Sequence, residues 1–470
     1  MREATGTSPR PFRRAIALVG AAAMLLAQVQ TVLAQAPATQ VIPGVIRDAE
    51  IEDLLRDYTR PILRAAKLGA QNIEVVIIGD RNFNAFVADG RRIFVNSGAL
   101  FDSTTPNQII GVLAHETGHI AGGHLSRLRE QLANAQTAAI IGMLLGLGAV
   151  AAGAAAGARD IGPAAAGAMM LPQQMAMGSI LSYQRSQEEA ADRAAVGFLN
   201  ATGQSARGMI ETFQRFAQDT LFISRRVDPY LMSHPMPRER IASLETVARA
   251  SPHFEAKDSP QLVFRHEMMR AKLAGFMERP EVVLRRYPSS NTTLPARYAR
   301  AISAYRFGSM ANAISQIDAL IAEQPKNPYF HELKGQALLE SGRAREAVPP
   351  LRQSVALSNG SPLIRMMLGQ ALVQTNDPTS MEEAIRNLRQ SLDKEPNAPL
   401  GWRQLAIAYG RKGDTANAEL AGALAAFNNA EFKTARQLAM RAKGRFPTGS
   451  PGWLKSDDIV NFKPPQLTQR

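Results

Sequence analysis

Residues 109–122, which read IIGVLAHETGHIAG, are the stretch of this chain that is most informative about its fold. Apolar residues flank the pentapeptide HETGH on both sides, and this pattern predicts a buried helix. Side chains four residues apart lie on one face of a helix, about one turn from each other. His115 and His119 are therefore predicted to project together, at a spacing that suits two corners of a zinc tetrahedron.

Glu116 follows His115 directly and supplies the general base that a hydrolytic metal site requires besides its metal ligands. A bound metal lowers the pKa of water toward about 7, and a carboxylate beside it can take the proton as the water attacks a peptide carbonyl, then pass it to the leaving amine. Buried histidines beside a buried glutamate are costly unless a ligand satisfies them. The motif therefore favours a zinc hydrolase with Glu116 as the catalytic base over an accidental match in a surface helix.

A third ligand is required, and His124 is a tempting choice. On a continuous helix, five residues past His119 correspond to about 500° of rotation. His124 is therefore expected to point away from the pair and to have a structural role. The metzincin pattern does not fit either, because its third histidine would fall at Leu125.

The stretch SQEEAADRAA (186–195) offers a better third ligand. Glu188 and Asp192 are four residues apart and share a helix face. Glu188 is predicted to ligate the metal, and Asp192 to accept a hydrogen bond from the free N–H of a ligand histidine. Glu189 is the alternative ligand, and a solvated charged face is the alternative for the whole stretch.

A small sheet is predicted before the metal motif. Residues 73–78 (IEVVII) and 92–96 (RIFVN) have strand propensity, and they flank residues 84–90 (NAFVADG), whose Asp-Gly pair is a hairpin turn signal. The sheet is expected to be antiparallel. The segments around it have helical periodicity, so the fold class is mainly α with a small β-sheet.

Residues 1–34 have the pattern of a secretory signal peptide. Arg10, Arg13 and Arg14 precede an uncharged run at 15–33, and the residues before position 35 suit cleavage after Ala34. An uncleaved anchor and a twin-arginine signal are the alternatives. Because the chain has no cysteine, it can carry neither a disulfide nor a lipid-modified N-terminal cysteine. A soluble protein of a bacterial periplasm is predicted.

The net positive charge of the chain indicates which binding partners it favours. The formal charge is +13, and residues 35–470 keep +10 of it, because residues 1–34 hold four arginines and one glutamate. Such a surplus favours anionic membranes or acidic partners. Nucleic-acid binding is set aside, because the basic residues are scattered and aromatic residues make up 6% of the chain.

Residues 136–158 carry no charged side chain and are long enough to cross a bilayer. They are rich in glycine and alanine, which contribute less insertion energy than leucine and isoleucine. Three interpretations of this Gly/Ala-rich segment (136–170) stay open. It could contact a membrane or form a lid, form a buried helical hairpin, or span a membrane.

Beyond Pro260 the sequence changes to helix pairs that repeat. Four alanines in similar settings are spaced by 34, 37 and 34 residues, which is the tetratricopeptide period with one insertion near residues 376–378; they are Ala313, Ala347, Ala384 and Ala418. The best single match is residues 402–409 (WRQLAIAY). An α-solenoid is predicted, whose concave face binds peptides or proteins.

Together, these motifs resemble the zinc metallopeptidase (gluzincin) family that includes the CAAX prenyl proteases. The residues that carry the resemblance are HETGH, EEAAD (188–192), NAF (84–86) and SHP (233–235). The order of signal peptide, catalytic domain and repeats is similar to that of the periplasmic members that act in outer-membrane β-barrel assembly. The resemblance covers essentially the whole chain after residue 34.

The resemblance implies roles for the motif residues. His115, His119 and Glu188 would bind one zinc ion, with Glu116 as the base. The strand of Asn84, Ala85 and Phe86 would lie along the cleft and pair with an extended substrate.

His234 stands where such proteins carry a histidine that can complete the zinc sphere and displace the attacking water. Hydrolysis requires an open coordination position, so the enzyme would rest in a latent state. The alternative is that His234 or Arg240 stabilises the oxyanion.

The implied organisation is a signal peptide (1–34), a zinc metallopeptidase domain (35–255), a tetratricopeptide domain (260–450) and a C-terminal tail (451–470). The implied function is that of a periplasmic zinc endopeptidase that degrades or assists misassembled outer-membrane β-barrel proteins. Its partners would be unfolded or stalled barrel proteins and the barrel-assembly machinery, with peripheral membrane contact. The alternative is a chaperone or assembly factor with little proteolysis.

Overall fold

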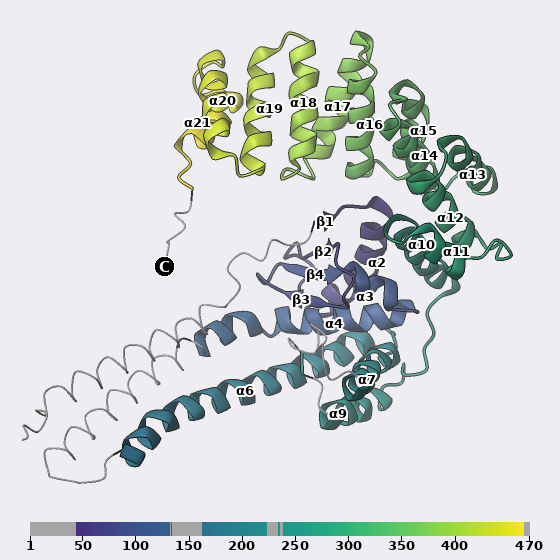
Figure 1. Cartoon of the computed structure of the whole chain (residues 1–470). Helices are drawn as coiled ribbons and strands as arrows, with labels where there is room; N and C mark the ends of the chain where they lie inside the picture. Colours follow the sequence, from purple (N-terminus) through teal and green to yellow (C-terminus); the bar gives the residue numbers. More distant parts are fainter. Residues whose placement is uncertain (1–43, 132, 134–161, 223–233, 236–237, 465–470) are drawn as a thin grey trace, which may run out of the picture. The chain divides into compact units, whose positions relative to one another are not determined.

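The computed structural model of the chain describes residues 44–131, 133, 162–222, 234–235 and 238–464 (Figure 1). The predicted signal peptide and the Gly/Ala-rich stretch up to residue 161 lie outside these residues. In the ranges that are described, no helix combines the length and the apolar character that crossing a membrane requires.

The sheet has four strands in the order β1-β2-β4-β3. They are β1 (Val45–Ile46), β2 (Glu74–Ile78), β3 (Ala85–Val87) and β4 (Arg92–Asn96). β3 and β4 form the predicted antiparallel hairpin, with Gly90 at its turn in the positive-φ region (+74°) that favours glycine. β2, however, runs parallel to β4. The prediction of an antiparallel sheet is therefore wrong for this pair.

The parallel pairing follows from the path of the chain between β2 and β3. The carbonyl of Asp80, just after β2, accepts hydrogen bonds from the Gly98 N–H and the Ser97 hydroxyl, both at 2.8 Å, at the start of α3 (Ser97–Asp102). The chain after β2 is thereby held beyond the end of β4. It then crosses to the side of β4 opposite β2, where β3 begins. A Cβ on Gly98 would lie 2.1 Å from the Arg81 carbonyl oxygen, so this crossing requires glycine.

Helices cover the sheet and share one hydrophobic core with it. The core includes Ile77 and Val95 from the strands and Leu113 and Phe213 from the helices, all of them at most 1% exposed. The helices are α2 (Ala49–Ala65), α4 (Pro106–Ala121), α6 (Gly162–Ala201), α7 (Arg207–Phe222) and α9 (Arg238–Arg249), with a further helix at 124–131. α4 carries the HETGH motif and lies between β3 and α6 (Figure 1).

Two glycines allow α4 to approach its neighbours closely. A Cβ on Gly111 would lie 2.5 Å from the Met209 Cβ of α7, and a Cβ on Gly118 would lie 2.8 Å from the Ala191 carbonyl oxygen of α6. Real Cβ atoms do not approach other atoms so closely. The second contact places α6 against the HETGH face of α4, and so sets the distance between the two predicted groups of ligands.

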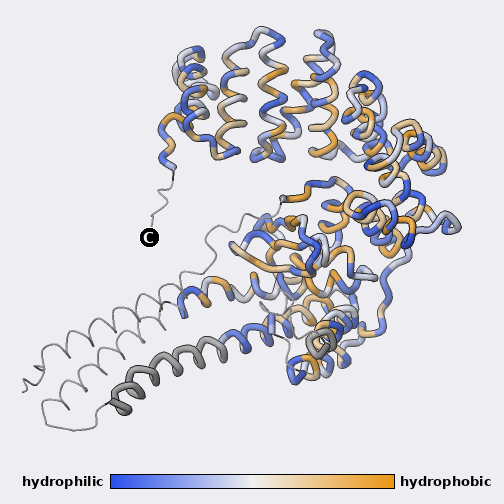
Figure 2. The backbone as a smooth tube through the Cα atoms, viewed as in Figure 1, coloured by the Kyte–Doolittle hydropathy of each residue, from blue (hydrophilic) through white to orange (hydrophobic). Residues whose placement is uncertain are grey.

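The C-terminal part consists of helices that contact their neighbours in sequence order. Each carries both hydrophobic and hydrophilic residues (Figure 2). They are α10 (Pro260–Met277), α11 (Pro280–Arg286), α12 (Leu294–Phe307), α13 (Met310–Glu323), α14 (Pro328–Glu340), α15 (Ala344–Leu357), α16 (Pro362–Gln374), the 3-10 helix η1 (Pro378–Ser380), α17 (Met381–Leu392), α18 (Pro399–Arg411), α19 (Thr415–Asn428), α20 (Phe432–Arg445) and α21 (Pro451–Asn461).

The same helix contact recurs along this part of the chain, as tetratricopeptide repeats require. A Cβ on Gly335 of α14 would lie 2.4 Å from Leu351 of α15, and a Cβ on Gly369 of α16 would lie 2.5 Å from Leu388 of α17. The three residues of η1 account for the one spacing of 37 rather than 34. The predicted tail contains α21, which buries Ile459 in a cluster shared with α19 and α20.

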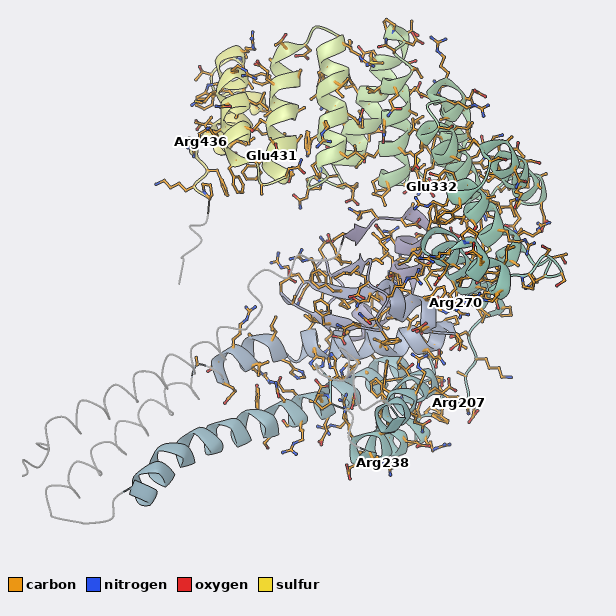
Figure 3. All side chains as sticks on the ribbon, in the orientation of Figure 1. Arg207, Arg238, Arg270, Glu332, Glu431 and Arg436 are labelled. Atoms are coloured by element: carbon orange, nitrogen blue, oxygen red, sulfur yellow. The ribbon has the colours of Figure 1, made fainter. Side chains whose placement is uncertain are left out.

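A buried charge cluster connects α10 to α2 and α14. Lys272 is 4% exposed, and its Nζ lies 2.8 Å from Asp48, 3.2 Å from Glu50 and 3.9 Å from Glu332, which is labelled in Figure 3. The Tyr298 hydroxyl donates to Glu50 at 2.9 Å. Burial alone would lower the pKa of Lys272, but the carboxylates raise it well above its ordinary value. Lys272 is therefore a permanent cation at this junction.

Candidate metal centre

Four side chains from α4, α6 and the segment before α9 converge on one point. One ligand atom each of His115, His119, Glu188 and His234 lies within 4.8 Å of the others. His115 Nε2 is 3.0 Å from His119 Nε2 and 3.3 Å from His234 Nδ1. The Glu188 carboxylate lies 3.0 Å from His234 Nδ1 and 3.3 Å from His119 Nε2.

This donor set fits a metal ion. Imidazole nitrogens and a carboxylate oxygen are ligand types of zinc, and here they face one another in a buried space. Burial alone would lower the pKa of His115, but Asp192 and Glu188 raise it to about 9, whereas burial lowers the pKa of His119 to about 4. The acidic neighbours of His115 therefore favour a positive charge at this donor. A divalent cation can meet that need and displace the proton.

Glu116 lies beside this cluster and is not one of its donors. Its side chain is 1% exposed, and Oε1 lies 3.5 Å from His234 Nε2. Within the described part of the chain, neither carboxylate oxygen has a hydrogen-bond partner. Burial raises the pKa of Glu116, against the opposing effect of His234 and His115. A carboxyl group in this state is suited to take and return a proton.

Asp192 links one histidine of the cluster to Arg240. Asp192 Oδ1 lies 2.9 Å from His115 Nδ1, and Arg240 donates to both Asp192 oxygens at 2.6 and 2.9 Å. Burial would raise the pKa of Asp192, but its bonds to Arg240 and His115 lower it. Arg240 Nη1 also lies 2.9 Å from Glu188 and donates to the Pro235 carbonyl. Arg240 thus contacts the acidic residues of the site and is not among the residues that line the cleft.

The cluster opens into a cleft of about 430 Å³. Phe86 and Val87 of β3 line it on one side of α4, and Gln184 and Gln187 of α6 line it on the other. Phe86 stacks on Phe94 of β4 at 5.2 Å between ring centroids.

The other two residues of the predicted strand lie next to this wall of the cleft. Asn84 directly precedes β3, and its carbonyl accepts from the Asn96 N–H at 2.9 Å. Ala85 is fully buried in the core.

Comparison with known proteins finds a family match for the part of the chain that contains this cluster. Residues 46–248 match the model of peptidase family M48. The chain contains an M48 metallopeptidase domain. All four converging residues lie inside the matched range.

Curated relatives resemble more than the M48 domain. The "Beta-barrel assembly-enhancing protease" of Yersinia pestis is 24% identical over 340 residues, which cover 72% of this chain and 68% of that protein. The "Putative beta-barrel assembly-enhancing protease" of Vibrio cholerae is 25% identical over 386 residues, covering 79% of this chain and 75% of that protein. The "Beta-barrel assembly-enhancing protease" of Escherichia coli K12 is 24% identical over 371 residues, covering 78% and 70%. These matches extend into the helical repeats.

The M48 domain also contains a contact between His119 and His124 that differs from the prediction made from the sequence. His124 was expected to point away from the histidine pair, yet its Nδ1 lies 3.0 Å from His119 Nδ1. The expectation assumed a continuous helix, whereas α4 ends at Ala121 and Gly123 has a φ of +61°. A Cβ on Gly122 would lie 2.2 Å from the His124 ring. The adjacent glycines were the available signal for this turn.

Glu189, the alternative ligand, lies outside the cluster. Its side chain is 54% exposed and pairs with Arg193 at 3.6 Å. Gln187, which the sequence analysis did not single out, is 7% exposed and lines the cleft. No sequence pattern marks it, because its burial depends on the packing of α6 against α4.

Proposed function

We propose that this metallopeptidase is a zinc endopeptidase of the bacterial periplasm that cleaves unfolded or stalled outer-membrane β-barrel proteins. The observation that carries the proposal is the donor cluster of His115, His119 and Glu188 beside the buried carboxyl group of Glu116, at the floor of a cleft bordered by an edge strand. His115, His119 and Glu188 would hold the metal, which when bound would polarise the substrate carbonyl and make water more acidic.

Glu116 would carry the proton through the reaction. Its raised pKa and the lack of competing hydrogen bonds from described residues suit it to accept a proton from the attacking water. The same carboxyl group can then donate that proton to the amine that leaves.

Two residues would keep the ligand histidines oriented. Asp192 Oδ1 lies 2.9 Å from Nδ1 of His115 and would hold that side of the ring, which leaves Nε2 directed at the metal position. His124 does the same for His119, because their Nδ1 atoms are 3.0 Å apart. Arg240 is better placed to hold Asp192 and Glu188 than to stabilise an oxyanion, since its guanidinium faces both acids.

His234 would act as a removable fourth ligand. Its Nδ1 lies within 3.3 Å of both His115 and Glu188, and a fourth protein ligand closes the position that hydrolysis requires. The enzyme would therefore rest in a latent state until His234 moves away.

The substrate class and the partners follow from the relatives and from β3. β3 lies at one end of the strand order, and a strand edge can pair with an extended peptide. The relatives named for β-barrel assembly match both halves of the chain, so we propose that the repeats contact the barrel-assembly machinery. The surplus positive charge suits a place beside an anionic membrane surface.

The test incubates the chain from Gln35 onward with an unfolded outer-membrane β-barrel protein and follows the intact substrate on a gel. Wild type, Glu116→Gln and His234→Ala are compared, with Glu189→Gln as a control in which an exposed acid of α6 is neutralised. We expect wild type and Glu189→Gln to cleave equally, Glu116→Gln not to cleave, and His234→Ala to cleave faster. Substrate that stays intact but bound with every variant would instead favour a chaperone.

A further inference from the structure

The wall of the cleft formed by α6 contains a buried amide with an unused donor. Gln187 is 7% exposed, and its Nε2 has no hydrogen-bond partner among the residues that the structure describes. It lines the cleft together with Gln184, and it directly precedes Glu188. A buried amide donor without a partner destabilises the fold, so its position in the cleft requires an explanation.

An extended substrate in the cleft would have its own unpaired groups. The main-chain N–H and C=O groups of a strand point toward both of its edges. If one edge pairs with β3, the other edge faces away from β3. β3 and α6 lie on opposite sides of α4 (Figure 1), so the second edge of the substrate would face the wall that contains Gln187.

We propose that Gln187 is a substrate-binding residue whose Nε2 donates a hydrogen bond to a main-chain carbonyl of the substrate. The inference rests on the proposed peptidase function and deepens it. β3 would bind one edge of the substrate and Gln187 the other, close to the metal ligand Glu188. Such a site recognises the extended backbone rather than particular side chains. Its substrates are therefore unfolded segments of varied sequence.

The test replaces Gln187 with methionine, which has a similar size and no donor. On a short unstructured fluorogenic peptide, we expect Gln187→Met to raise KM by roughly 3- to 10-fold, the effect of one neutral hydrogen bond, with kcat within about twofold of wild type. Metal content should be unchanged, and the melting temperature should be equal or higher, because an unpaired buried donor is removed. Gln71→Met, at an exposed position outside the cleft, should change neither KM nor the melting temperature.

A binding measurement separates this inference from the peptidase proposal. The Kd of the same peptide is measured by fluorescence anisotropy on Glu116→Gln, with and without Gln187→Met, so that no cleavage is required. A Kd that rises roughly 3- to 10-fold supports the inference even if wild type does not cleave. An unchanged Kd and KM would overturn it, and so would a lower melting temperature with loss of metal, which would indicate a structural role for Gln187.

Discussion

The contact between α4 and α6 makes metal binding depend on a single missing methyl group. A Cβ on Gly118 would lie 2.8 Å from the Ala191 carbonyl oxygen, whereas ordinary contacts begin at 3.4 Å. Gly118→Ala must therefore separate the two helices locally by about 0.6 Å, which is the difference between these two distances. His115 and His119 are on α4 and Glu188 is on α6, so the ligand set widens by a similar amount.

That displacement exceeds the tolerance of a metal site, where ligand distances hold to about 0.2 Å. We expect Gly118→Ala to weaken metal binding by about 10-fold or more, the size of effect seen when ligand orientation is disturbed. Stability should change less. Overpacking costs about 1–3 kcal/mol, and the better helix propensity of alanine offsets about 1 kcal/mol of it. The net loss in the free energy of unfolding is then about 0–2 kcal/mol.

The assay measures metal affinity by competition with a chelating dye and stability by urea denaturation. Gly197→Ala is the matched control, because Gly197 is in α6, the helix that Gly118 contacts, and an added Cβ there meets nothing within 4 Å. It should keep the metal affinity of wild type and gain up to about 1 kcal/mol in stability. If Gly118→Ala folds normally and binds metal as tightly as wild type, the reasoning from helix separation is refuted.

Three further changes probe the site and its support. Glu188→Gln should remove most of the metal from the purified protein, while Glu189→Gln should not; stoichiometric metal in the former, measured by atomic emission, would exclude Glu188 as a ligand. His124→Leu should weaken metal binding by about 10- to 100-fold in the chelator assay, and an unchanged affinity would argue against its role in orienting His119. Burial lowers the pKa of His266 to about 4 from its ordinary value near 6.5, so the unfolded chain binds a proton below pH 6.5 that the folded chain does not. The free energy of unfolding is therefore unaffected by this proton above pH 6.5, and it decreases as the pH falls from 6.5 toward 4. By pH 5 wild type should lose about 2 kcal/mol more than His266→Gln, and equal losses in urea denaturation would contradict the shift.

The parts of the M48 domain that depend on local sequence could be predicted. HETGH required only the geometry of one helix, and α4 places His115 and His119 with their Nε2 atoms 3.0 Å apart. The repeat period likewise placed the insertion where η1 occurs, because each repeat contacts mainly its neighbours.

The features that were missed depend on where the chain turns. His124 lies beside His119 because the helix stops and restarts at Gly122 and Gly123, so the rotation of a continuous helix does not apply. The parallel pairing of β2 with β4 depends on a loop that is held by the Asp80 carbonyl. In the sequence, Gln187 does not differ from a glutamine on a solvated helix face. Its burial results from the packing of α6 on α4, which the sequence pattern does not predict.

The charge cluster around Lys272 has a consequence for how such a protein can evolve. Asp48 and Glu50 lie at the start of α2 in the M48 domain, and the cation that neutralises them comes from α10. A gene encoding only the segment before residue 260 would leave these acids without that cation. Repeats exchanged by recombination would therefore need a cation at the position of Lys272 to neutralise these acids. The charge balance of this cluster thus couples the sequence of α2 to that of α10.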